Sequence, residues 1–385
     1  ISLVVLLLVV SVVPLGAQTA NVTVTPIASN LNNPRGVAVL PDGRLTVVEA
    51  GTGETPRTET TGTGQLTILT DANDDGDFND EDERDVLLGG LPSYNSLALF
   101  GTFHDEVFGL GDVVHIGDGV FFFTKDDPFA EFVRNRGDEV FYGDTGLFEM
   151  REDWFRPRRL IKRSATLNAL AYDPVADLFY SVESGFNRLM SVDADGEPQI
   201  VAEFSDLASG QQAVPAGIAV DARTGEVLVA LFSGFVHDYY GETLSFMPGD
   251  AKVVRVDPTT GAISDAVTGL TTAIDVAVDE QGNLYIAELT TVWPTPLMPL
   301  TFDLHDPTQP PDPGGYVRYS GRISRIPAGG GPRETLVNGL DTPTNLSYVN
   351  GALYVSTGLG TPGRTVTTPD GIQPIEGVLY RITGF

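Results

Sequence analysis

One hairpin phrase recurs along this chain of 385 residues. Each copy has a short apolar strand, a turn of a few residues containing Gly or Asp, and a second apolar strand. Regular copies begin at Gly36, Asn168, Gly217, Asp275 and Asn345. A less regular copy lies within residues 96–124, where GDVVHIGDGVFFFT resembles the hairpin and SLALF competes as its first strand. A repeat of about 50 residues is typical of propellers and solenoids, so it restricts the fold more than any other feature.

Further strands follow most of the hairpins. After the copy at Gly36 they are GQLTILTD and RDVLLGG, and after the copy at Asp275 they are GRISRIPAGG and RETLVNGL. Four antiparallel strands per repeat form one blade of a β-propeller. We therefore predict an all-β, six-bladed propeller. A β-sandwich, or a pair of them, is the alternative for short alternating strands, but it does not explain why the hairpin recurs at one place in each repeat.

The two ends of the chain are both strand-like. The last repeat offers only three strands, NLSYV, ALYVST and GVLYRITG, and the segment NVTVTPIAS near the N-terminus can supply the fourth. Pairing of the N- and C-terminal strands would close the ring and protect the sheet edges. No Pro/Ser-rich or charged linker divides residues 21–385, so we expect one propeller domain there.

Residues 1–20 form a separate apolar segment that resembles a signal peptide. Its apolar run is shorter than the roughly 20 residues of a membrane span and is followed by the small residues Gly16 and Ala17. We predict a secreted, extracellular or cell-surface protein, with this segment either cleaved or retained and buried against another subunit. The chain has no cysteine, which excludes disulfides, thiol catalysis and cysteine-ligated metals.

The net charge of -29 restricts the partners of the chain. Such a surface repels nucleic-acid phosphates and anionic lipid headgroups, so neither is an expected partner. Calcium and cationic groups suit it, although acidic surfaces also serve solubility alone.

The segment DANDDGDFNDED fits a calcium loop of the D-x-[DN]-x-[DN]-G type. In such loops alternate residues direct oxygen atoms at one hard cation, and a glycine permits the sharp turn. The expected calcium ligands are Asp71, Asn73, Asp75, Asp77 and Asp82, where Asp82 replaces the usual Glu at the twelfth position. Strand-like segments flank the loop, so calcium would stabilise the outer strands of the first blade. The alternative is a solvated acidic turn.

Strand alternation predicts a second site at one mouth of the central channel. The long inserts 50–62, 233–250, 289–319 and 358–376 all follow the second strand of a repeat, so they lie on one face. Polar residues at the starts of first strands and the ends of second strands should open onto the same face. These channel-mouth candidates are Glu49, Asn168, Glu183, Asp275, Glu288 and Asn345. They could bind a metal, a sugar or a peptide, or they could only satisfy backbone groups at strand ends.

The phrases NPRGVAVLPDGRLTVVEAGTG, PSYNSLALFG and NGLDTPTNLSYVNGALYVSTGLG resemble the ScyD/ScyE family of secreted proteins, relatives of the NHL-repeat propellers. The resemblance covers roughly residues 25–385. It implies the propeller fold and export, and it implies no particular reaction.

Two classes of function remain open. No catalytic constellation is visible, because the sequence lacks a Gly-x-Ser-x-Gly elbow and phosphate-binding glycine loops, and none of His104, His115, His237 and His305 lies at a repeat-equivalent rim position. We therefore predict a non-catalytic calcium-binding scaffold that engages a peptide or protein partner, or copies of itself, through its insert-bearing face. The alternative is an enzyme at the channel mouth, either a calcium-dependent lactonase-like hydrolase or a sugar-oxidising enzyme. Six-bladed lactonases hold a central metal with Glu, Asn and Asp, whereas quinone-dependent sugar dehydrogenases need a basic pocket with His and Arg.

Overall fold

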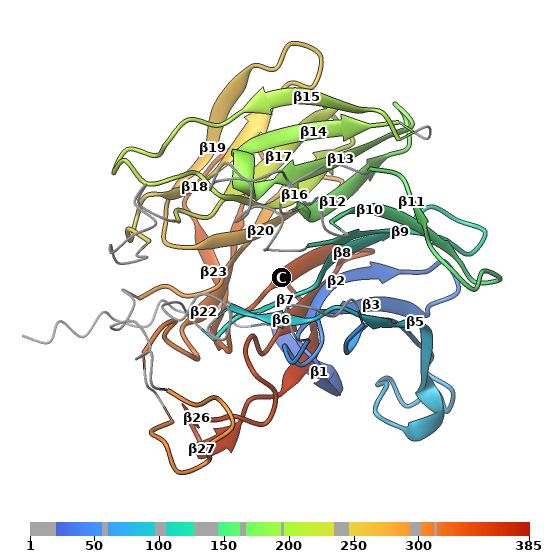
Figure 1. Cartoon of the computed structure of the whole chain (residues 1–385). Coiled ribbons are helices and arrows are strands. Elements are labelled where there is room, and N and C mark those ends of the chain that lie inside the picture. Colours follow the sequence, from blue (N-terminus) through green and yellow to red (C-terminus); the bar gives the residue numbers. More distant parts are fainter. Residues whose placement is uncertain are drawn as a thin grey trace, which may run out of the picture.

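Six four-stranded antiparallel sheets are arranged around a common axis (Figure 1). The computed structural model of the chain describes residues 21–55, 61–96, 105–126, 145–161, 167–193, 196–234, 246–292, 302–311 and 314–385. The prediction of a six-bladed β-propeller is confirmed. Among the described residues, no helix is long and apolar enough to cross a membrane.

Each blade runs outward from an inner strand at the axis. Blade 1 consists of β2 (Pro34–Val39), β3 (Leu45–Glu49), β4 (Gly64–Leu69) and β5 (Arg84–Leu91). Blade 2 consists of β8 (Leu110–His115), β9 (Val120–Lys125), β10 (Gly146–Arg151) and β11 (Arg158–Arg159). Blade 3 consists of β12 (Leu167–Asp173), β13 (Leu178–Glu183), β14 (Arg188–Val192) and β15 (Pro198–Glu203). Blade 4 consists of β16 (Pro215–Asp221), β17 (Glu226–Leu231), β18 (Ala251–Val256) and β19 (Ile263–Leu270). Blade 5 consists of β20 (Ala273–Val278), β21 (Leu284–Glu288), β22 (Gly321–Ile326) and β23 (Glu334–Leu340).

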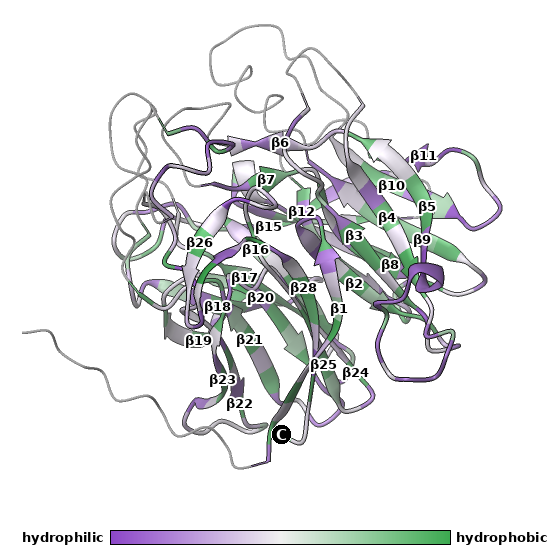
Figure 2. Ribbon diagram, turned by 90° about the horizontal axis from the view of Figure 1, so that it is seen from below, coloured by the Kyte–Doolittle hydropathy of each residue, from purple (hydrophilic) through white to green (hydrophobic). Residues whose placement is uncertain are grey.

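Blade 6 joins the two ends of the chain. It contains β24 (Asn345–Val349), β25 (Ala352–Thr357), β28 (Gly377–Thr383) and, at its outer edge, β1 (Thr23–Leu31). The register of β1 on β28 runs from Thr23 opposite Thr383 to Leu31 opposite Gly377. Figure 2 shows β1 lying beside β28. The predicted closure by the terminal strands is thus confirmed, and β1 covers the edge of β28 that would otherwise be open to solvent.

Apolar side chains fill the spaces between neighbouring blades. Between blades 3 and 4, for example, Val182 and Leu189 pack in one cluster with Val227 and Val229. In Figure 2 the hydrophobic residues follow the strands of the blades. Burying each Val or Leu side chain contributes about 1.5–3 kcal/mol, so the repeated interfaces between blades hold the ring together.

A β-bulge interrupts the inner strand of five blades at the same place, one to three residues after the strand begins. In blade 1 two residues, Arg35 and Gly36, lie opposite the single residue Val48. Blade 6 alone pairs without such a shift between its first two strands. Bulges re-aim side chains and increase local twist, and here they lie around the axis at one end of the channel.

The second blade begins at Leu110, so GDVVHIGDGVFFFT forms its hairpin as β8 and β9. Most of the competing segment SLALF lies outside the described residues, as do residues 1–20 and parts of the inserts 50–62, 233–250 and 289–319. Two small ribbons lie beside the blades: β6 (Tyr94–Asn95) with β7 (Val107–Phe108), and β26 (Thr365–Thr368) with β27 (Gly371–Pro374).

The ring closure gives a stability prediction. The informative truncation begins at Asn32, because it removes all of β1 and leaves β2 intact. Because Ile27 and Leu31 are almost fully buried, we expect a loss of about 3–6 kcal/mol in the free energy of unfolding. Thermal and urea unfolding, compared with a chain that begins at Asn21, measure it. Equal stability of the two chains would contradict the role of β1.

Candidate functional site in the central channel

A cavity of about 80 Å³ lies at the axis, where residues of all six blades meet. Its charged and amide side chains are Arg35, Glu106, Asp112, Asp126, Asn168, Asp275 and Asn345. The structure therefore brings together three of the channel-mouth candidates, Asn168, Asp275 and Asn345. It adds four charged residues that the sequence analysis did not select.

The bulges of the inner strands supply the lining. Arg35, Asn168 and Ala216 are bulge residues of blades 1, 3 and 4, and Ile274 is the bulge residue of blade 5. All of them line the cavity. A regular strand would direct alternate residues into the blade interfaces, so the bulges explain how one ring of side chains reaches the axis.

Asp112 and Asp275 hold equivalent positions in blades 2 and 5. Asp112 accepts hydrogen bonds from the backbone N–H groups of Val113 (2.8 Å) and Leu170 (2.9 Å). Asp275 accepts them from Val276 and Leu346, both at 2.8 Å. Each carboxylate thus joins its own blade to the next one.

The preceding blade also packs closely on each carboxylate. A Cβ atom on Gly36 of blade 1 would lie 2.1 Å from Oδ1 of Asp112, and one on Gly217 of blade 4 would lie 2.2 Å from Oδ1 of Asp275. Only glycine permits this approach. Blades 1–3 and blades 4–6 therefore repeat the same arrangement of glycine, aspartate and backbone N–H around the channel.

Burial changes the acidity of both aspartates. It raises the pKa of Asp112 to about 7, against the two backbone N–H groups, which lower it. Burial, together with the nearby Asp112 carboxylate, raises the pKa of Asp275 well above its ordinary value. A carboxyl group with a pKa near 7 can act as a general base or acid at neutral pH.

Asn345 presents an oxygen atom that no described residue satisfies. Its side chain is 7% exposed, its Nδ2 donates to Oδ2 of Asp275 (2.9 Å), and its Oδ1 has no hydrogen-bond partner in the described parts of the chain. A buried polar atom without a hydrogen-bond partner costs free energy of folding, and such atoms often bind a water, an ion or a ligand. Carboxylate and amide oxygens are the ligands that calcium prefers, so the residue types of Asn345 and Asp275, which contact each other, suit a hard cation.

Arg35 is the one cationic side chain lining the described cavity. It donates from Nη2 to the carbonyl oxygen of Val107 (2.8 Å) and lies 3.8 Å from Oε1 of Glu106. Burial lowers the pKa of Arg35 and raises the pKa of Glu106, and each charge partly offsets the shift of the other. The cavity thus offers one positive group among several carboxyl groups.

Aromatic residues from the inserts cover part of this region. The rings of Phe246 and Tyr316 are stacked at 6.1 Å, and Phe232 meets Tyr316 edge-on at 6.4 Å. The same apolar cluster includes Ala216 and Ile274, which line the cavity. These contacts connect the inserts 233–250 and 289–319 with the channel mouth.

The other three channel-mouth candidates lie elsewhere. Glu49 accepts hydrogen bonds from the backbone N–H of Asn32 (2.7 Å), and Glu288 accepts one from that of Thr271 (2.9 Å). Glu183 pairs with Arg188, and Glu288 pairs with Arg322. None of the three lines the cavity, because each is held within its own blade near the start of the inner strand. Glu49 and Glu288 thus satisfy backbone N–H groups, which was the alternative considered from the sequence.

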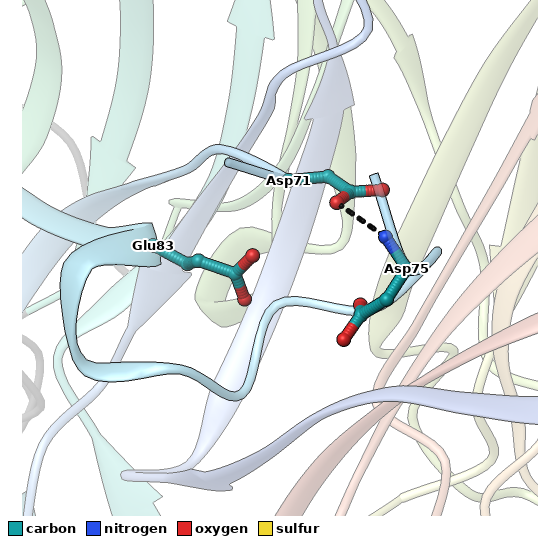
Figure 3. A group of neighbouring side chains, drawn as sticks. All are labelled: Asp71, Asp75 and Glu83. Atoms are coloured by element: carbon teal, nitrogen blue, oxygen red, sulfur yellow. Dashed lines mark hydrogen bonds between the residues drawn. The ribbon is translucent and has the colours of Figure 1, made fainter. Parts of the chain in front are cut away.

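The acidic loop between β4 and β5 brings carboxylates together. Oxygen atoms of Asp71, Asp75 and Glu83 all lie within 4.8 Å of one another. Figure 3 shows the three side chains around the loop, with the backbone N–H of Asp75 donating to Asp71. These residues fit a hard cation, and Glu83, which is buried, is a member that the sequence analysis missed.

The remaining loop candidates differ in their placement. Asp82 is exposed and lies outside the carboxylate cluster, because a 3-10 turn over Glu81–Glu83 directs the thirteenth residue of the loop inward in place of the twelfth. Asp77 accepts a hydrogen bond from the backbone N–H of Asn79 (2.9 Å). Asn73 donates from Nδ2 to Asp80 (2.8 Å), and its Oδ1 accepts from the backbone N–H of Asp75.

The same loop is anchored on the closing strand. The backbone N–H of Phe78 donates to the carbonyl of Ile27 (2.7 Å), and the Phe78 ring packs in the cluster that contains Ile27 and Leu379. The backbone N–H of Ser29 donates to Asn79 (3.0 Å). The loop therefore joins blade 1 to β1. The sequence analysis had expected it to stabilise only the outer strands of blade 1.

Comparison with known proteins now identifies the family. The model of the SMP-30/Gluconolactonase/LRE-like region matches residues 40–290, more than half of the chain. The chain belongs to this family. No protein of curated function matches the chain. The narrower resemblance to ScyD/ScyE stays a prediction.

Solved structures of similar fold share little sequence with this member of the SMP-30/gluconolactonase family. The PQQ-bound aldose sugar dehydrogenase of Streptomyces coelicolor is 13% identical, with 95% of this chain and 100% of that chain covered and a TM-score of 0.51. A luciferin-regenerating enzyme is 12% identical, with 94% and 96% covered and a TM-score of 0.52. At such identities the likeness concerns the fold.

One cavity residue of this family member could have been found from the sequence. Aligning the less regular hairpin with the copy at Asp275 puts Asp112 at the same position, since both are followed by Val in a first strand. Glu106 and Asp126 carry no such signal, because they precede and follow the hairpin of blade 2. Arg35 lies at a bulge, which the period of two in a strand does not reveal.

Asp112 predicts a pH-dependent stability. The folded state keeps its proton up to about pH 7, whereas the unfolded chain releases it near the ordinary value of 3.8. The stabilisation is therefore fully present below pH 3.8 and is lost as the pH rises through about 7. We expect Asp112→Asn, which cannot ionise, to gain stability relative to the wild type over this range. Urea unfolding with a chelator present measures the difference.

The exposed hairpin variant Asp370→Asn serves as the control for this titration. Its free energy of unfolding, compared with that of the wild type, should not follow the change with pH that is expected for Asp112→Asn. A pH-independent difference for Asp112→Asn would contradict the raised pKa.

The acidic loop predicts a calcium effect that separates two neighbouring residues. At a calcium concentration a hundred times Kd, the wild type should gain about 2.7 kcal/mol in the free energy of unfolding. Glu83→Gln should lose most of this gain, because Glu83 belongs to the carboxylate cluster, whereas Asp82→Asn should retain it. Unfolding in calcium and in chelator measures both. Equal losses for the two variants would contradict the geometry of the loop.

Proposed function

We propose that this chain is a lactone hydrolase that acts at the cavity in the central channel. The observation that carries the proposal is the meeting of Asp112, which has a pKa of about 7, with Arg35 and the unsatisfied Asn345 oxygen in one cavity. Membership in a family named in part for gluconolactonase supports this class of reaction.

The proposed reaction uses the chain's own acid–base groups. Water adds to the carbonyl carbon of the lactone, the bond from that carbon to the ring oxygen breaks, and a hydroxy acid forms. Asp112 accepts the proton of the attacking water and returns it to the departing ring oxygen. Arg35 stabilises the negative charge that develops on the carbonyl oxygen as water adds, and the product acid then releases its remaining proton to solvent.

Calcium is part of the proposal at two places. In the cavity, oxygen atoms of Asp275 and Asn345 would hold it beside Asp112, and bound calcium would polarise the lactone carbonyl as a Lewis acid. In the acidic loop, Asp71, Asp75 and Glu83 would hold it as a structural ion that joins blade 1 to the closing strand.

The enzymatic alternative thus replaces the non-catalytic scaffold as the leading interpretation. The family and the acid–base groups of the cavity favour catalysis. Among the residues that the structure describes, those lining the cavity include one arginine, four carboxylic acids and no histidine. Such a lining does not suit the basic pocket of a quinone-dependent sugar dehydrogenase. Secretion, and binding of a peptide or protein partner on the insert-bearing face, stay predictions.

Turnover of simple lactones tests the proposal. Acid release from D-glucono-1,5-lactone and γ-butyrolactone is followed in calcium and in chelator, with spontaneous hydrolysis subtracted. The rate should rise with pH through about 7, as Asp112 loses its proton. Asp112→Asn should lower kcat by about 10²–10⁴-fold.

Asp370→Asn, which changes an exposed residue outside the cavity lining in the turn between β26 and β27, should keep the wild-type rate. Absence of turnover above buffer for both lactones in calcium would overturn the proposal and return the scaffold to first place. Full activity of Asp112→Asn would remove Asp112 from the proposed chemistry.

A further inference from the structure

A second cavity, of about 210 Å³, lies between two inserts on the face that carries the channel mouth. One wall is formed by residues 302–310 and the other by residues 362–365, next to the ribbon of β26 and β27 (Figure 1). Its lining shares no residue with the central cavity. The volume is below the roughly 300–1,000 Å³ typical of drug-sized ligands, so it suits one small molecule.

Arg364 forms part of the lining and is held rigidly. Its Nε donates to Oδ2 of Asp105 (2.6 Å), and its Nη1 donates to the carbonyl oxygen of Pro311 (3.2 Å). Its Nη1 also lies 3.5 Å from the carbonyl oxygen of Thr365. The side chain is 9% exposed, and its Nη2 has no hydrogen-bond partner among the residues described. The guanidinium therefore keeps donor capacity for a ligand oxygen without further loss of side-chain freedom.

The charge of Arg364 is already balanced. Asp105 is 3% exposed and also accepts hydrogen bonds from the backbone N–H and hydroxyl of Thr361, and its pKa is lowered. The pair is thus neutral, and the carboxylate of Asp306 adds negative charge at the lining. An anionic ligand would meet the carboxylate of Asp306 and the net charge of -29. A cationic ligand would meet the N–H donors of Arg364, which have no lone pair to offer it.

Apolar ring surface completes the lining. Phe302 lies with its ring centroid 5.9 Å from the Arg364 guanidinium carbon, and Pro307, Pro310 and Pro362 add C–H surface. His305, Gln309 and Thr365 contribute polar groups. Flat apolar surface beside several hydrogen-bonding groups suits a small ring that carries hydroxyl groups.

We propose that this cavity binds a neutral monosaccharide-sized polyol, with Phe302 against its C–H face and Arg364 donating to a hydroxyl oxygen. The proposal does not depend on hydrolysis at the central cavity. The two sites are nonetheless adjacent in sequence, because Asp105 holds Arg364 and the next residue, Glu106, lines the central cavity beside Arg35.

Isothermal titration with D-glucose, D-gluconate and D-glucosamine tests the proposal by binding alone. We expect saturable binding of D-glucose with a Kd on the order of 1 mM, and weaker binding of both charged analogues. Phe302→Ala and Gln309→Ala should each weaken D-glucose binding, Phe302→Ala by about tenfold. The control Phe155→Ala, which removes a 99% exposed ring on blade 2, should bind as the wild type does.

Several outcomes would overturn the site. They are no saturation with D-glucose at concentrations on the order of 50 mM, tighter binding of D-gluconate or D-glucosamine, or unchanged binding in both Phe302→Ala and Gln309→Ala. Melting curves establish that each variant is folded. Because no step measures turnover, failure here is distinct from failure of the proposed hydrolase.

Discussion

Six inner strands have to approach one another around a narrow axis, and two buried aspartates make this possible here. Asp112 and Asp275 each accept a backbone N–H of the next blade and lie against a glycine of the preceding one. Each carboxylate thus satisfies one backbone N–H group of its own inner strand and one of the inner strand of the next blade. The same burial that makes them useful for packing raises their pKa values. A structural requirement of the ring has therefore placed acid–base groups at the axis.

Closure of the ring depends on a second set of contacts at the outer edge. β1 pairs with β28, and the acidic loop of blade 1 reaches β1 through Phe78 and Asn79. A cation in that loop would reduce repulsion among its carboxylates and stabilise the junction between the first and last blades. The two proposed calcium positions therefore have different consequences: one affects the closure of the ring, and the other affects chemistry at its axis.

Inserts on one face connect the axis with a more peripheral region. Asp105 and Glu106 are consecutive, yet the first holds Arg364 of the last insert and the second faces Arg35 of blade 1. The aromatic cluster of Phe232, Phe246 and Tyr316 lies over the same mouth. A ligand bound beside Arg364 would thus lie one residue along the chain from Glu106, which lines the central cavity.

The sequence by itself determined the number of blades, the pairing of the terminal strands and the position of the acidic loop, because each depends on local periodicity and on residues close together in the chain. It also selected Asn168, Asp275 and Asn345, which start inner strands.

Only the tertiary structure decided which side chains share a cavity. Arg35 reaches the axis through a bulge, whereas Glu49 and Glu288 turn back to backbone N–H groups of their own blades. A 3-10 turn likewise puts Glu83, and not Asp82, beside Asp71. Bulges and short turns shift the direction of a side chain by one residue. A sequence pattern that assumes a regular period cannot predict that shift, because the packing of neighbouring blades determines it.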